Sequence, residues 1–138
     1  MSVTQAVVVL VEDHLITLNR VVGLIRRRNF PVHTLSIGPT GTPGVSRLTI
    51  MMQSDHAAAE RAVQHLQKVV GVHDAAVIPQ GDAVVLELTG SEAFVLSCLR
   101  ALERFEIIEI ARSGAVAMES GTAELRFGAQ PQLEAGAR

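Results

Sequence analysis

The side chains in this chain that could carry out chemistry are five histidines, one cysteine and several acids. The histidines are His14, His33, His56, His65 and His73. They form neither an HxH nor an HExxH pattern and fall on different expected elements, which argues against a metal site. Cys98 lies on the apolar side of an expected helix, a position typical of a small core residue. As the lone cysteine, it cannot form a disulfide within the chain.

The acids Glu87, Glu106 and Glu109 fall in or beside expected strands and have no histidine or serine at a spacing that would pair them for acid–base catalysis. The glycine-rich stretch GPTGTPG, residues 38–44, lacks the Lys-Ser/Thr of a phosphate-binding loop. Its glycines and prolines indicate a hairpin loop. The sequence therefore predicts no catalytic residue, no metal ligand and no cofactor held by this chain.

A polar turn between an expected strand and an expected helix is the best candidate binding site. The turn consists of Glu12, Asp13, His14, Leu15, Ile16 and Thr17. The first N–H groups of a helix have no partner inside the helix, so such a turn can hold a small ligand. The alternative interpretation is an ordinary helix cap made by Asp13 or Thr17.

Arginines supply a second candidate, a surface for a protein partner. Arg20 and the run Arg26, Arg27 and Arg28 lie mostly off the apolar stripe of the helix that follows the turn. They fit a docking patch for an acidic partner surface. They also fit a solvated helix end, because cations are favoured near a helix C-terminus.

Composition narrows the function classes. The chain has 138 residues, of which 48% are hydrophobic and only 3% aromatic, and its net charge is −2. A core of Val, Leu, Ile and Ala is expected, and nucleic acid is not expected as a partner, because neither a basic face nor stacking aromatics are present. No apolar run approaches a membrane span or resembles a signal peptide. We expect a cytoplasmic protein without membrane contact.

Hydrophobic periodicity predicts two halves of matching length. Strands are expected at residues 7–11, 31–37, 45–53 and 72–78. The helix after the first strand has the apolar stripe Leu18, Val21, Val22 and Ile25, and the helix after the third has the stripe Ala59, Ala62, Val63, Leu66 and Val70, ending at Gly71. The order βαββαβ predicts an α+β, ferredoxin-like fold: a four-stranded antiparallel sheet with both helices on one face.

A shorter unit is expected after this domain, which we place at residues 1–79. Residues 80–118 contain an expected strand at 83–89, a helix capped by Ser91 and a strand at 105–112. Val95, Cys98, Leu99 and Leu102 form the stripe of that helix, and Ile108 and Ile110 are expected to face inward. Residues 119–138 are predicted to form a loose tail with a brief ordered stretch at 125–127. So short a unit is expected to dock on the first domain or on a copy of itself, and a homodimer is expected.

Five stretches together resemble a known family. They are LNRVVGLI at residues 18–25, LSIGPT at 35–40, SRLTI at 46–50, LQKVV with the following Val72 at 66–72, and EIARSG at 109–114. None is specific alone. Their order and spacing resemble the regulatory small subunits of acetolactate synthase (acetohydroxyacid synthase), which begin with an ACT domain of βαββαβ order. The expected C-terminal unit is a shortened form of the family's second domain.

The resemblance implies a non-catalytic subunit in branched-chain amino acid biosynthesis. It would bind and activate a large, thiamine-diphosphate-dependent catalytic subunit, and in many members valine inhibits through the small subunit. The implied effector, valine or another branched-chain amino acid, lies between two ACT domains near the turn after the first strand. The implied effector residues are Glu12 to Thr17 with Pro31 and Val32. Arg20 and Arg26 to Arg28 remain the expected contacts with the catalytic subunit.

The chain departs from the family pattern both in the turn and at the start of the second strand. The turn has no glycine, which in the family lets the backbone approach a ligand closely, and Ile16 adds a branched side chain. Asp13 stands where the family has Asn and would repel an amino-acid carboxylate, while Pro31 replaces the usual Asn after the aromatic Phe30. We therefore expect valine feedback to be weakened or lost. The alternative function is a stand-alone ACT-type amino-acid sensor acting through oligomerisation.

Overall fold

The computed structural model describes residues 3–79 and 86–117. The first part contains four strands and two helices in the predicted βαββαβ order. Their bounds are β1 Thr4–Glu12, α1 Leu15–Arg28, β2 Val32–Pro39, β3 Val45–Gln53, α2 His56–Leu66 and β4 Val72–Ile78. A third helix, α3, spans Glu92–Leu102. The predicted ferredoxin-like domain is confirmed.

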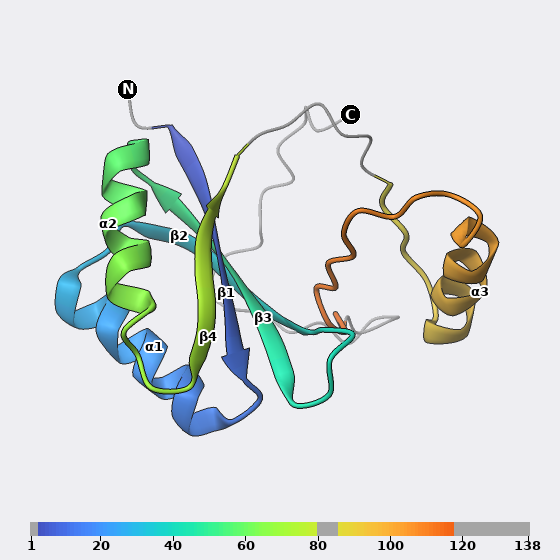
Figure 1. Cartoon of the computed structure of the whole chain (residues 1–138), viewed down its shortest axis with the longest axis horizontal. Coiled ribbons are helices and arrows are strands. Elements are labelled where there is room, and N and C mark those ends of the chain that lie inside the picture. Colours follow the sequence, from blue (N-terminus) through green and yellow to red (C-terminus); the bar gives the residue numbers. More distant parts are fainter. Residues whose placement is uncertain (1–2, 80–85, 118–138) are drawn as a thin grey trace, which may run out of the picture.

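The four strands form one antiparallel sheet in the order β2-β3-β1-β4. β1 is therefore central, with Val9 opposite Leu48 of β3 on one side and Ala75 of β4 on the other. The connection between β2 and β3 is the predicted hairpin loop. Helices α1 and α2 both lie on one face of the sheet, and α3 lies away from them beyond the opposite face (Figure 1). β2 and β4 are left as the two edges.

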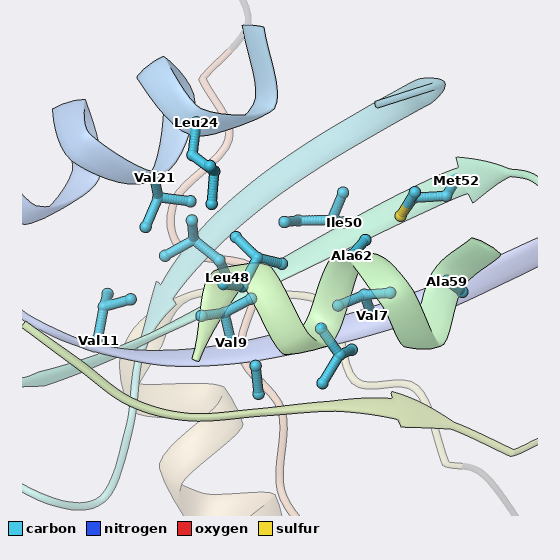
Figure 2. Packing of buried hydrophobic residues seen from close by; sticks show 13 residues of the cluster. Val7, Val9, Val11, Val21, Leu24, Leu48, Ile50, Met52, Ala59 and Ala62 are labelled. Atoms are coloured by element: carbon cyan, nitrogen blue, oxygen red, sulfur yellow. The ribbon is translucent and has the colours of Figure 1, made fainter. Parts of the chain in front are cut away.

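The hydrophobic core lies between the sheet and the two helices. The strands contribute every second residue to it, because successive strand side chains point to opposite faces. From β1 and β3 these are Val7, Val9, Val11, Leu48, Ile50 and Met52, all essentially inaccessible to solvent. Val21 and Leu24 of α1 and Ala59 and Ala62 of α2 point toward them (Figure 2). The predicted alternation along β3 is confirmed.

Helix α1 is rotated slightly from its predicted orientation. Its buried residues are Thr17, Val21 and Leu24, spaced by four and three positions along one face. Val22, predicted to be buried, is 44% exposed. The helix is capped at its C-terminus by Asn29, which adopts the left-handed conformation with φ 51°.

Helix α2 begins at Asp55, whose carboxylate accepts a 2.7 Å hydrogen bond from the Ala58 N–H. The helix is shorter than predicted: it ends at Leu66, and Gly71 is not its stop. Val70 is 73% exposed because it lies on the connection to β4 and not on the helix. Gly71 has a different role, described below.

The C-terminal unit is less regular than predicted. The Ser91 cap of α3 is confirmed, since its hydroxyl accepts from the Phe94 N–H. The strand expected at residues 105–112 is wrong: no residue there is in a strand, and Ile108, expected inward, is 86% exposed. An extended segment becomes a strand only when it pairs with another strand, and among the residues described the sheet pairs only β1 to β4. Residues 86–89 are also not a strand.

Residues 83–85, the start of the strand expected at 83–89, lie outside the described residues. So does the ordered stretch expected at 125–127. The predicted tail at 119–138 does too.

Residues 105–117, called the C-terminal segment below, run against the face of the sheet that the helices leave open. Gly38 of β2 is buried there, and a Cβ at this glycine would lie 1.9 Å from the Arg112 carbonyl oxygen. Arg47 of β3, on the same face, forms an ion pair with Glu109. The open face of the sheet is therefore partly covered by this chain itself.

Candidate functional site

The turn between β1 and α1 is held by two loops from distant parts of the chain. The Glu12 N–H donates a 2.8 Å hydrogen bond to the carbonyl of Gly71, before β4. The Asp13 N–H donates a 2.9 Å hydrogen bond to the carbonyl of Gly44, before β3. The path of the turn is therefore fixed by the domain around it, and two of its amides are already paired.

Neither of the predicted helix caps exists. The Asp13 carboxylate accepts a 3.0 Å hydrogen bond from the Ser46 hydroxyl instead. The N-cap residue of α1 is His14, in extended conformation and without a side-chain capping bond. Its carbonyl accepts from the N–H groups of Thr17 and Leu18, at 3.0 and 3.2 Å.

Two amides at the start of α1 remain available to a ligand. They belong to Leu15 and Ile16, the first two residues of the helix, which have no intrahelical acceptor. Within the described part of the chain no other backbone carbonyl accepts from them. Leu15 is 83% exposed and Ile16 is 59% exposed. The large apolar side chains beside these two N–H groups therefore lie in solvent.

A small cavity of about 100 Å³ adjoins this turn. It is lined by Val11, Glu12, Asp13, His14, Leu15, Leu18 and Ile37. Cavities that enclose a small ligand usually measure ~300–1,000 Å³. One chain therefore supplies only part of the wall that an amino-acid effector would need.

Gly71 is a constraint on the turn that sequence reasoning missed. Its φ is +93°, and a Cβ there would lie 2.5 Å from the hydroxyl oxygen of Thr17 and 3.1 Å from a carboxylate oxygen of Glu12. Thr17 is fully buried, and its hydroxyl has no hydrogen-bond partner among the described residues. The signal for this role was a lone glycine between two valines, which is also compatible with a helix stop.

Pro31 and Val32 do not meet the turn within one chain. β1 and β2 are both antiparallel to β3, so they run parallel to each other. Pro31 therefore precedes the start of β2, while the turn follows the end of β1. Helix α1, about 21 Å long at 1.5 Å per residue, separates them. Ile37, near the end of β2, meets the turn instead.

Three of the four arginines predicted to contact a partner lie together in the structure. Arg20, Arg27 and Arg28 line an open groove of about 430 Å³, which we call the basic groove, whereas Arg26 does not. The other lining residues are Leu24, His65, Lys68, Val69 and Val70. Sequence reasoning missed this second wall, because the residues after Leu66 were expected to continue α2.

The remaining candidates from the sequence stay dispersed. In residues 3–79 and 86–117, no three His, Cys, Asp or Glu side chains come together in a way that could hold a metal ion. Cys98 is half-buried on α3. None of the helices described is long and apolar enough to cross a membrane.

Comparison with protein families explains this architecture. The model of the acetohydroxyacid synthase (AHAS) small subunit-like ACT domain matches residues 7–74. The model of the small subunit of acetolactate synthase matches residues 50–121, more than half of the chain. The chain belongs to the acetolactate synthase small-subunit family. The family resemblance carried by the five short stretches is thereby confirmed.

Relatives in this family come from archaea and bacteria. A probable acetolactate synthase small subunit of Archaeoglobus fulgidus is 26% identical over 154 residues, covering 85% of this chain and 97% of the relative. A putative small subunit of Mycobacterium tuberculosis H37Rv is 29% identical, covering 86% and 93%. The isozyme 3 small subunit of Escherichia coli K12 is 34% identical over 80 residues, covering 58% and 49%.

The alignment with the Archaeoglobus protein also bears on length. It extends over 154 positions, more than the 138 residues of this chain. The alignment must therefore contain gaps within this chain, which lacks internal residues that the Archaeoglobus protein has.

A solved structure agrees with the fold. The acetolactate synthase small subunit of Thermotoga maritima superposes with a TM-score of 0.55 at 23% identity, covering 80% of this chain and 74% of that one. The similarity extends beyond the length of the βαββαβ domain, which ends at Ile78.

Proposed function

We propose that this chain is a non-catalytic regulatory subunit that binds and activates the catalytic subunit of acetolactate synthase in branched-chain amino acid biosynthesis. The observation that supports this function is the pair of family matches, which together run from residue 7 to residue 121. The catalytic subunit would supply the thiamine diphosphate. This chain would act by packing against that subunit.

The proposed contacts with the catalytic subunit are Arg20 and the arginines of the last turn of α1, of which Arg26 lies outside the basic groove and is expected to contribute least. All of them are exposed. The ion pairs of the described residues are Arg47–Glu109 and His56–Glu60, so none of the arginines of α1 is neutralised within this part of the chain. Their guanidinium groups remain free to bind carboxylates of another protein.

A homodimer through the ACT domains would complete the effector site. β2 is an open edge whose Leu35 and Ile37 are more than one third exposed, and such an edge pairs readily with another strand. Two-fold pairing of β2 with its copy would be antiparallel. It would bring the start of one β2, with Pro31 and Val32, toward the end of the other, next to the second turn. The cavity would then gain a second wall.

We propose further that valine feedback is weak or absent. In the turn, the Asp13 carboxylate adds a negative charge close to where the carboxylate of an amino acid would approach the amides of Leu15 and Ile16. The Asp13 N–H is already paired with Gly44. The family has a glycine in this turn. This chain has none, and Ile16 adds a branched side chain.

The test is acetolactate formation by the cognate catalytic subunit, with and without this chain and with and without valine. The expected result is stimulation that valine reverses little or not at all. Full reversal by valine would contradict the proposal of weakened feedback and leave the regulatory role intact. Absence of stimulation would contradict the regulatory role.

The second candidate is a stand-alone amino-acid sensor, favoured by the two available amides of α1 beside a cavity. Thermal unfolding in the presence of each of the twenty amino acids distinguishes it. A ligand at 100 times its Kd stabilises a domain by about 2.7 kcal/mol. A shift of this size, with no stimulation of the catalytic subunit, would favour the sensor.

A further inference from the structure

The basic groove is walled on one side by α1 and on the other by the residues that follow α2. Arg20, Arg27 and Arg28 come from α1, while Lys68 and the half-buried His65 come from the second wall. Its volume, about 430 Å³, is roughly four times that of the cavity at the turn. It is the larger of the two hollows described above.

Every ionisable residue that lines this groove is basic. No aspartate or glutamate lines it, and no ion pair within the described residues involves Arg20, Arg27 or Lys68. Arg20, Arg27, Arg28 and Lys68 lie together here in a chain whose net charge is −2, so the rest of the chain is negative overall. A concave surface lined with one sign of charge strengthens the local field and attracts the opposite sign.

Two of the guanidinium groups are positioned by the protein. Arg20 donates a 3.4 Å hydrogen bond from Nη1 to the Val70 carbonyl, which joins the two walls. Arg27 lies back along its own helix, where a Cβ at Gly23 would be 3.3 Å from its Nη1. Gly23, which has no side chain, thus leaves room for the Arg27 side chain. Leu24 and Val69 add an apolar floor between the charges.

We infer that the basic groove receives an acidic segment of the catalytic subunit, with Asp or Glu side chains flanking an apolar residue. This inference rests on the proposed regulatory function and specifies its contact surface. A protein segment fits better than a small anion, because the arginines and the lysine that line the groove are exposed, whereas a small-ligand site buries most of its ligand. The carboxylates pair with the arginines, and the apolar residue covers Leu24 and Val69.

The experiment measures the Kd between this chain and the purified catalytic subunit for charge-reversal variants. Arg27→Glu and Lys68→Glu reverse a charge on each wall of the groove. Arg61→Glu is the matched control, since Arg61 is exposed on α2 and does not line the groove. We expect Kd to rise at least about tenfold for both groove variants, because like charges then face each other, and to change less than about twofold for Arg61→Glu.

Arg26→Glu separates the groove from the helix end, because Arg26 is adjacent to Arg27 in sequence but lies outside the groove. Its effect is expected to be much smaller than that of Arg27→Glu. Equal effects of the two variants, with wild-type activation intact, would overturn the groove and leave the regulatory function standing. Wild-type protein that neither binds nor activates the catalytic subunit would overturn both. Unchanged thermal unfolding of all variants shows that the fold is retained.

A small anion as the occupant is tested with inorganic tripolyphosphate. If it raises the unfolding temperature of the wild type and not of Arg27→Glu, while the catalytic subunit binds both equally, the groove is a small-anion site. That outcome would overturn the inference. The expected result is that excess tripolyphosphate competes with the catalytic subunit only weakly, through screening of charge.

Discussion

Helices α2 and α3 have the same length and the same kind of start, yet one is part of a core and the other is not. Each has 11 residues and begins with a side-chain cap, Asp55 for α2 and Ser91 for α3. α2 buries Ala59, Ala62, Val63 and Leu66 against the sheet, whereas α3 has no buried residue. The length and the N-cap of a helix therefore do not decide whether its side chains are buried. The difference is that α2 packs on the sheet and α3 does not. Tertiary packing of this kind supplies most of the stability of a short helix.

The largest expected effect compares one leucine from each helix. Leu66→Ala in α2 should lower the free energy of unfolding by about 2–5 kcal/mol, because Leu66 is 1% exposed and its loss leaves a cavity. Leu99→Ala, on the half-buried stripe of α3, should cost less than about 1 kcal/mol. Urea denaturation measures both. Equal losses would mean that α3 packs in solution against a surface such as a second copy.

The next effect concerns the loop that connects α2 to the sheet. Gly71→Ala should cost about 1–3 kcal/mol, since the residue has φ +93° and the new Cβ would collide with Thr17. Gly41→Ala is the matched control: its Cβ would meet nothing within 4 Å, and its φ is not positive. Thermal unfolding compares the two variants. If Gly41→Ala destabilised as much as Gly71→Ala, the constraint at the turn would be refuted.

A smaller effect is expected where the C-terminal segment meets the sheet. Gly38→Ala should displace that segment, because the Cβ would lie 1.9 Å from the Arg112 carbonyl oxygen. The free energy of unfolding should change by less than about 1 kcal/mol, since the segment is exposed along most of its length. Hydrogen exchange should become faster in residues 105–117 and stay slow in β1 and β3. Loss of protection throughout the sheet would show instead that the segment stabilises the domain.

The smallest effect is expected to be stabilising. Thr17→Val replaces a fully buried hydroxyl that has no partner among the described residues with a methyl group of similar size. Removing an unsatisfied polar atom without changing shape should raise the free energy of unfolding by about 0.5–1 kcal/mol. Denaturant midpoints at constant m-value test this. A decrease would indicate that the Thr17 hydroxyl is hydrogen-bonded in solution, for example to the neighbouring Glu12.

The part of the fold that the sequence predicted correctly is the part governed by periodicity. The strict alternation in β3 located Leu48, Ile50 and Met52 in the core, and the stripe of α2 was right through Leu66. The errors begin where periodicity gives two answers. Val22 and Leu24 lie on neighbouring rows of α1, and only the contact with the sheet decides that Leu24 is the buried one.

Long-range contacts account for the other errors. Residues 105–112 have the alternation of a strand, but alternation cannot show whether a partner strand is present. The two walls of the basic groove are separated by about forty residues, and the Gly71–Thr17 contact by more than fifty. The turn was recognised as a candidate site from its polar residues. Its bonds to Gly44, Ser46 and Gly71 depend on the folded domain, so the sequence did not reveal them.

The central place of β1 in the sheet has a consequence for biosynthesis. β1 is made first, but its two neighbours are β3 and β4, which end at Gln53 and Ile78. Its apolar run, residues 7–11, therefore leaves the ribosome without a partner strand and cannot be enclosed on both sides until the chain has emerged as far as Ile78. Non-local pairing of this kind makes folding slow, and it exposes the nascent N-terminal strand to aggregation. Within this domain β1 is therefore synthesised before both of the strands that enclose it.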